Sequence, residues 1–148
     1  MAKSAVTLNA VLQLLFQNAN FAGVGDATGL RGSTSAGSLF VGLHIADPKT
    51  GGAEVNYAEY IRVPVARSAA GWTVNGLEVS NTAKVTFPKR DTDGPVQRAE
   101  YFSIYSAATG GVLIGSEVLG QALDIGLGVT PEFDVGQLVS EFVQLPPA

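Results

Sequence analysis

The chain has 148 residues, a length at which one domain can bury a substantial core without disulfides or metals. It contains no cysteine, which excludes disulfides, thiolate metal sites and thiol catalysis but leaves the cellular compartment open. The net charge is −4 and the nine basic residues are scattered, so nucleic-acid binding is not expected. Charged residues make up only 15% of the chain, against roughly 25% in soluble domains. This low charge fits either a polar, uncharged exterior or a surface packed against neighbours.

The hydropathy pattern argues against a membrane protein. No apolar run approaches the roughly 18 residues of a membrane-spanning helix. The apolar segment 6–16 is short, and no basic region or small-residue cleavage site accompanies it. We therefore expect neither a membrane partner nor a secretory signal.

One amphipathic helix is predicted within the first twenty residues. Thr7 is a candidate N-cap, and Asn18 and Asn20 favour termination of the helix before Phe21. Apolar side chains recur with helical spacing on one face, at Leu8, Val11, Leu12, Leu15 and Phe16. This face either covers one end of a β core or belongs to an arm that docks on another subunit.

A Gly- and Ser-rich segment, residues 22–38, follows the helix. It has no periodicity and is long for a connection in a compact domain, which is typical of a loop that is mobile, functional or ordered by a partner. We therefore divide the chain into an N-terminal arm, residues 1–38, and a β-sandwich domain, residues 39–148. Deletion of the arm is expected to abolish attachment to a partner and to leave the β domain folded.

From residue 39 onward the apolar period changes to two, which indicates strands. Pro64 lacks an N–H group, so its strand should lie at a sheet edge or carry a bulge. Asn75-Gly76 predicts a type I′ hairpin turn. Strands are predicted in segments 39–45, 61–65, 71–74, 77–79, 83–87, 100–105, 112–119, 123–125, 132–133 and 138–143. Many short strands with one N-terminal helix predict a mainly β fold, an antiparallel β-sandwich or jelly-roll-like domain.

Residues capable of catalysis are sparse. His44 is the only histidine, so a multi-histidine metal site is excluded and any Ser-His-Asp triad would have to use it. Placed in a strand opposite Leu43 and Ile45, it is expected to be structural. The Gly23-Val24-Gly25 segment follows a helix, whereas the dinucleotide-binding fingerprint follows a strand and opens a helix.

Metal and acid–base sites are not expected either. Asp91 and Asp93 resemble the start of a calcium loop, but Phe102 stands where an EF-hand places its bidentate glutamate. The carboxylate pairs Glu54/Glu59 and Asp124/Glu132 lie in polar or turn-rich contexts without a sign of a raised pKa. We expect no catalytic residue, no metal and no cofactor.

Several segments resemble a widespread family of small tailed-bacteriophage virion proteins, often labelled tail-fibre proteins. The matching pieces occur in order between residues 39 and 142: LHIADP (43–48), YIRVPVAR (60–67), AGWTV (70–74), VTFP (85–88), TGG (109–111), TPEF (130–133) and GQL (136–138). The chain departs from the family in its charged segment 89–93 and in the length of the 22–38 loop. Both are places where adaptation to a particular neighbour is expected.

The resemblance implies a non-enzymatic virion structural protein. The preferred interpretation is a capsid decoration or cement protein that binds the outside of the head, with the major capsid protein, copies of itself, or both as partners. A tail-fibre or neck-associated protein and a receptor- or glycan-binding module are the alternatives. The expected location is the virion, and the host cytoplasm during assembly.

Trp72, the single tryptophan, is expected in the core, with an aromatic interface anchor as the alternative. The candidate interface residues come from the helix, the loop, the tryptophan hairpin and the charged segment: Leu12, Leu15, Phe16, Phe21, Arg31, Trp72, Lys89, Arg90, Asp91 and Asp93.

Overall fold

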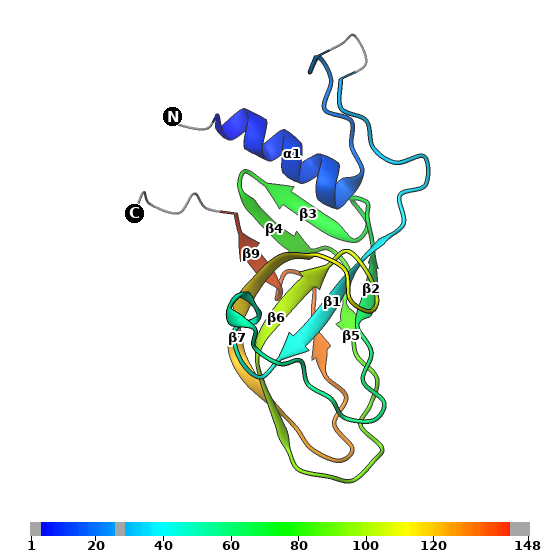
Figure 1. The fold of residues 1–148 in the computed structure, drawn as a ribbon, viewed down its shortest axis with the longest axis vertical. Coiled ribbons are helices and arrows are strands. Elements are labelled where there is room, and N and C mark those ends of the chain that lie inside the picture. The colour runs from blue at the N-terminus through cyan, green and yellow to red at the C-terminus, as the bar shows by residue number, and fades with distance from the viewer. Residues whose placement is uncertain (1–3, 26–28, 143–148) are drawn as a thin grey trace.

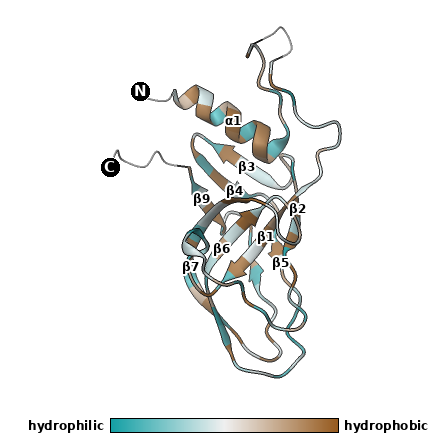
Figure 2. Cartoon of the chain, in the orientation of Figure 1, coloured by the Kyte–Doolittle hydropathy of each residue, from teal (hydrophilic) through white to brown (hydrophobic). Residues whose placement is uncertain are grey.

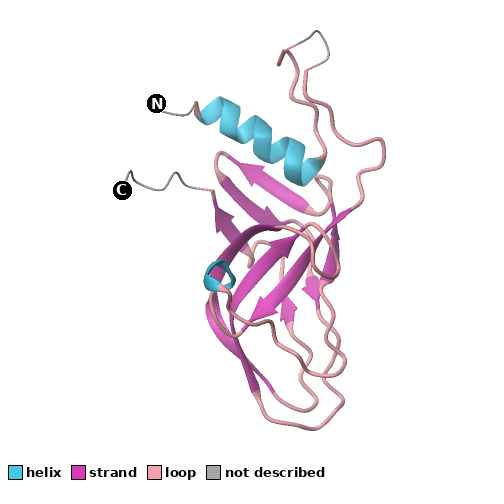
Figure 3. Ribbon diagram, in the orientation of Figure 1, coloured by secondary structure: helices cyan, strands magenta, loops and turns pink. Residues whose placement is uncertain are grey.

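The computed structural model describes residues 4–25 and 29–142. Its elements follow one another along the chain as α1 (Ala5–Gln17), β1 (Ser38–His44), the 3-10 turn η1 (Pro48–Thr50), β2 (Val63–Ala66), β3 (Trp72–Asn75), β4 (Glu78–Asn81), β5 (Val85–Thr86), β6 (Gln97–Tyr105), β7 (Leu113–Ile125), β8 (Glu132–Phe133) and β9 (Val139–Glu141). The expectation of a mainly β, antiparallel fold with one N-terminal helix is confirmed (Figures 1 and 3).

Three antiparallel sheets surround one core. The four-stranded sheet has the order β2-β1-β6-β7, the three-stranded sheet β3-β4-β9, and the two-stranded sheet β5-β8. Side chains from all three sheets and from α1 form a single hydrophobic cluster, which includes Phe16, Trp72, Phe87, Phe102 and Ile125. In Figure 2 the apolar stretches run through the central strands β1 and β6, whereas apolar and polar residues alternate along α1.

The helix begins three residues earlier than the sequence predicted. Ser4, rather than Thr7, is the N-cap: its hydroxyl accepts a hydrogen bond from the Thr7 N–H at 3.4 Å. The predicted stop is confirmed, because the helix ends at Gln17 and Asn18 adopts the left-handed conformation with φ 56°.

The helix packs on the three-stranded sheet. Phe16 is fully buried, and its ring meets Trp72 edge-on at 5.3 Å between centroids and Phe142 at 5.5 Å. Leu12 is also buried in the common core. Of the two interpretations of the apolar helix face, covering one end of the β core is therefore the one that the structure shows.

Strand boundaries follow burial. Ile45 and Ile61, which the alternating pattern placed inside strands, lie outside β1 and β2 and are 45% and 61% exposed. The prediction that Pro64 lies in an edge strand is confirmed, since β2 is at one edge of the four-stranded sheet. The segments 112–119 and 123–125 belong to one strand, β7, instead of two.

The tryptophan hairpin turns one residue later than predicted. Asn75 pairs with Glu78, so Gly76 and Leu77 form the two-residue loop. Gly76 has φ +62°, whereas Asn75 does not have a positive φ, so the prediction of an Asn75-Gly76 type I′ turn is wrong. Leu77, which lies in the loop, packs against the core.

Candidate functional site

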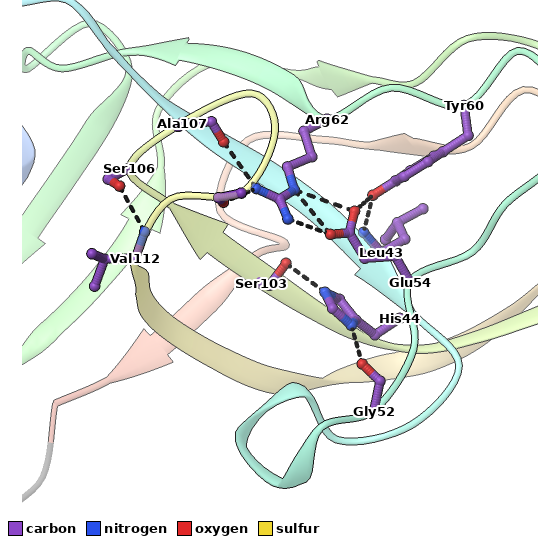
Figure 4. Close-up of polar contacts among 11 residues, drawn as sticks. Leu43, His44, Gly52, Glu54, Tyr60, Arg62, Ser103, Ser106, Ala107 and Val112 are labelled. Atoms are coloured by element: carbon purple, nitrogen blue, oxygen red, sulfur yellow. Dashed lines mark hydrogen bonds and ion pairs between the residues drawn. The ribbon is translucent and has the colours of Figure 1, made fainter.

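A polar cluster covers the outer face of the four-stranded sheet, on the side away from the hydrophobic core (Figure 4). Its centre is the ion pair of Arg62 with Glu54, in which the Arg62 Nε donates to both carboxylate oxygens at 3.0 and 3.2 Å and Nη2 adds a further short contact. Tyr60 donates its hydroxyl to Glu54 at 2.7 Å. The Arg62 guanidinium also lies 3.6 Å over the ring of Tyr105.

Arg62 connects segments that are far apart in the sequence. Its Nη1 donates to the carbonyl oxygens of Ala107 at 2.9 Å and Gly110 at 2.7 Å, in the turn between β6 and β7. In the same turn the Val112 N–H donates to the Ser106 hydroxyl at 2.8 Å. The arginine therefore fixes this turn against the chain that leads into the edge strand β2.

The environment of the ion pair changes the acidity of its members. Burial alone raises the pKa of Glu54, but hydrogen bonds from Arg62 and Tyr60 and the charge of Arg62 outweigh it, so the pKa lies below its ordinary value. Burial, followed by the hydrogen bond to Glu54, raises the pKa of Tyr60. The network is thus built for one protonation state, with Glu54 ionised and Tyr60 neutral.

His44 and Ser103 form a second polar pair on the same face. The His44 Nε2 lies 2.9 Å from the Ser103 hydroxyl, and Nδ1 lies 2.9 Å from the Gly52 carbonyl oxygen. Because a carbonyl only accepts, Nδ1 carries the proton, and in the neutral ring Nε2 accepts from the serine. Ser103 is fully buried and His44 is 2% exposed. The arrangement resembles a nucleophile with its base, but the serine hydroxyl is closed to a substrate, and the pair joins β1 to β6.

Two further arginines bind backbone carbonyls. Arg67 donates to the last turn of α1, at the carbonyl oxygens of Leu14 and Leu15, both at 2.7 Å. It also reaches the Ser33 hydroxyl at 3.1 Å. The C-terminus of the helix, the loop after it and the segment after β2 therefore meet at this one guanidinium.

Arg90 organises the opposite end of the molecule. Its side chain donates to the carbonyl oxygens of Thr92 at 3.0 Å, Pro95 at 2.8 Å and Ile125 at 2.8 Å. Only 3% of Arg90 is exposed. The charged segment 89–97 is therefore a loop folded around a buried arginine.

The candidate interface residues divide into three groups. Leu12, Phe16, Trp72 and Arg90 are buried in the chain itself, so their proposed contact with a partner is corrected: the folded protein does not present them. Leu15 and Phe21 are half-buried. Arg31, Lys89, Asp91 and Asp93 are exposed: Lys89 and Asp91 form an ion pair at 2.7 Å in the loop that also carries Asp93, and Arg31 lies in a separate loop.

No metal-binding cluster of three or more His, Cys, Asp or Glu side chains occurs within residues 4–25 and 29–142. In the predicted calcium-like segment, Asp91 pairs with Lys89, and the Asp93 carboxylate accepts the Gly94 N–H at 2.9 Å. Across the same described ranges, no helix has both the length and the apolar character needed to cross a bilayer.

Comparison with known families identifies the chain. Residues 2–141 match the family described as podophage GP4 fiber I protein gp80. The chain belongs to this family. It is accordingly a phage virion structural protein of a tail-fibre-like family, and the virion is where it acts. No curated protein matches the sequence.

The gp80 family match confirms the resemblance to virion structural proteins and extends it. The sequence segments that suggested the family began at residue 39, whereas the match begins at residue 2 and includes the helix and the loop after it. The N-terminal 38 residues are thus part of the family pattern, in keeping with their share of the core.

Sequence reasoning missed the residues that organise this gp80-family fold: Glu54, Tyr60, Arg62 and Arg67, together with the role of Arg90. A signal was available in the YIRVPVAR segment, where Tyr60, Arg62 and Arg67 flank an apolar strand. Cations beside a buried strand are costly unless they are paired, so they indicate internal partners as readily as a partner-binding surface.

Proposed function

We propose that this chain is a non-enzymatic, fibre-associated structural component of the virion that acts through protein–protein contacts. The family match over residues 2–141 carries the proposal. The structure gives a second argument for it. The polar side chains that most resemble a catalytic or binding site form internal contacts that stabilise the fold. The Ser103 hydroxyl is closed to substrates, Arg62 is occupied by Glu54 and two carbonyl oxygens, and Arg67 and Arg90 bind mainly backbone carbonyl oxygens.

The proposal includes no cofactor and no nucleic-acid partner. In the described residues three of the exposed basic side chains are already engaged with carboxylates: Lys84 with Glu132, Lys89 with Asp91, and Arg98 with Asp124. A phosphate backbone would have to displace these pairs on a chain of net charge −4. Contacts with other virion proteins require no such concentration of positive charge.

Capsid decoration, with the major capsid protein as the partner, is the second candidate function. It is favoured by the compact single core, because a fibre shaft is expected to bring extended or repeated sequence, which this chain of 148 residues does not show. A small folded domain attached at the base of a fibre, or along it, is consistent both with the compact core and with membership of a fibre-protein family.

Immunogold electron microscopy of purified virions tests the assignment. An antibody against the full chain is applied to intact particles and to particles that lack fibres. Label confined to the fibres and their attachment points is expected. Label spread evenly over the head would favour capsid decoration, and particles without label would contradict a virion component.

A further inference from the structure

The segment between α1 and β1 forms a projecting tongue, defined as residues 18–25 and 29–37. In Figure 1 it extends beyond α1, away from the sheets. Phe21 and Leu30 exchange both backbone hydrogen bonds, at 2.8 and 2.9 Å, so two limbs of the chain run antiparallel. Gly29 makes the pairing possible, because a Cβ there would lie 2.2 Å from the Phe21 carbonyl oxygen. The described part of the loop is therefore a paired structure instead of an irregular one.

Asparagine side chains hold the base of the tongue. The Asn18 amide donates to the Ser33 carbonyl oxygen at 2.9 Å and its oxygen accepts the Ser33 N–H at 2.7 Å. The Asn20 side chain accepts the Gly32 N–H at 2.9 Å. Arg67 then joins this base to the helix and to the segment after β2. The tongue is thus preorganised, which lowers the ordering cost of docking on a partner.

The tongue presents an apolar and a cationic side chain to solvent. Leu30 is 45% exposed. Arg31 is exposed and forms no ion pair or side-chain hydrogen bond with residues 4–25 or 29–142. Because Phe21 and Leu30 are a hydrogen-bonded pair, the backbone N–H and C=O of Arg31 point away from the other limb and are free to pair with another strand.

A groove of matching character lies between β7 and β8. It encloses about 540 Å³ and is lined by Leu119, Gly120, Gln121, Ala122, Leu123, Glu132, Phe133 and Gln137. Here β7 departs from its register with β6: Ala99 pairs with Leu123 and Tyr101 with Val118, so residues 119–122 stand opposite Glu100 alone. β7 and β8 are both edge strands of their sheets. The groove therefore combines apolar lining side chains, Leu119, Leu123 and Phe133 among them, with irregular, incompletely paired strand edges.

The charged residues in the lining distinguish this groove from two others as a binding site for an arginine side chain. The groove lined by Phe40, Ile61 and Pro64 holds Glu54 together with Arg62, and the groove lined by Ile45 and Val96 holds Glu54 and Glu100 together with Arg98. The β7–β8 groove has Glu132 and no cation in its lining. Lys84 contacts only the Oε2 atom of Glu132, at 2.6 Å. The Oε1 atom remains for a second cation.

We infer that the tongue of one copy docks in the β7–β8 groove of a second copy. Leu30 packs on Leu123 and Phe133, and Arg31 pairs with Glu132. In Figure 1 the tongue and the groove strands lie far apart along the long axis, so a chain cannot fill its own groove. The contact joins two different surfaces, so it either repeats head-to-tail into rings or open filaments or is made twice in a reciprocal dimer. The inference rests on the proposed function and names a partner for it.

Disulfide trapping tests the contact directly, because the natural chain contains no cysteine. The full-length double variant Arg31→Cys/Glu132→Cys is oxidised and run on a non-reducing gel. Covalent dimers or higher multimers are expected, because the cysteine on each tongue would meet the cysteine in the groove of a neighbouring copy. Each single variant should stay mainly monomeric, because its cysteine would face the natural Glu132 or Arg31. A double variant that cross-links no more than the single variants would overturn the inference.

Charge reversal provides an independent measurement by sedimentation velocity. Arg31→Glu is expected to weaken self-association about tenfold or more, as for loss of an interfacial charge pair. Mixing the Arg31→Glu protein with a Glu132→Lys protein should restore association through the new pair. Lys49→Glu removes another exposed cation and serves as the matched control. Equal weakening by Lys49→Glu, or a monomeric wild-type protein, would overturn the inference.

Incorporation into virions separates the two proposals. If the wild-type chain is present on particles but is monomeric in solution, and the double cysteine variant does not cross-link, the copy-to-copy contact is wrong and the virion role stands. If the chain is missing from particles, the proposed function itself fails.

Discussion

At the residue scale, Arg62 connects the edge of the four-stranded sheet to the β6–β7 turn through Glu54, Ala107 and Gly110. Replacing Arg62 with Met leaves Tyr60 as the remaining hydrogen-bond donor to the Glu54 carboxylate among the described residues, and it frees the turn. Loss of one partner of a buried ion pair costs 3–5 kcal/mol, and the 24% exposure of the Glu54 side chain lowers the expected cost to about 2 kcal/mol. Urea unfolding measures this change.

Arg62→Lys is the control for that experiment. It keeps the positive charge but not the forked geometry that reaches the carboxylate and two carbonyl oxygens together. We expect it to be intermediate in stability. A Met variant as stable as the wild type would show that the cluster does not stabilise the fold.

The same ion pair predicts a pH dependence. The pKa of Glu54 is lower in the folded chain than its ordinary value, because the bonds from Arg62 and Tyr60 outweigh burial. Its contribution is therefore fully present above the unfolded-state pKa and is lost as the pH falls through the folded-state pKa. The stability difference between wild type and Glu54→Gln should be largest near neutral pH and should shrink in acid. A difference that does not change with pH would contradict this account.

At the scale of elements, α1 is part of the core. Phe16→Ala should destabilise the protein by about 3–5 kcal/mol, because it removes a fully buried ring that packs on Trp72 and Phe142. Val6→Ala on the same helix is the control, since Val6 is 78% exposed. Deletion of residues 1–38 is accordingly expected to unfold the β domain instead of leaving it intact, and circular dichroism with thermal melting checks both variants.

Arg67 connects helix α1 to the tongue. Arg67→Gln removes the charge at the α1 C-terminus and the contact with Ser33. Hydrogen exchange should become faster at the paired amides of Phe21 and Leu30, whereas the amides of β6 should be little changed. Unchanged protection of the tongue would show that Asn18 and Asn20 hold it without the arginine.

The sequence predicted the elements better than the polar contacts. The strands could be located because a strand with one buried face has apolar residues at every second position. Pro64 indicated an edge strand because it lacks an N–H group. The hairpin turn at Gly76 was displaced by one residue: Val74 pairs with Val79, and β4 pairs on its other side with β9 from the end of the chain. Such long-range pairing cannot be seen in a local pattern.

The candidate site was predicted less well. Arg90 was expected at an interface because it lies in a charged segment, yet it is 3% exposed and binds the carbonyl oxygen of Ile125, 35 residues away. Only the fold brings these groups together. Phe16 and Trp72 were proposed both as core and as interface residues, and the packing of one on the other decides for the core.

At the scale of the whole molecule, a single core joins the helix and all three sheets, and the half-buried Arg67 and the buried Arg90 bind backbone carbonyl oxygens at its two ends. The surface that remains carries isolated apolar side chains and mostly paired charges. These features suit a small domain that is added to a larger assembly. The family match places that assembly in a phage virion.

The copy number of the chain in purified virions, measured by quantitative mass spectrometry against the major capsid protein, tests the central claim most directly. A fibre-associated component should be present in every preparation at a ratio far below that of the capsid protein. A ratio close to that of the capsid protein would contradict the fibre assignment and would establish a decoration of the head.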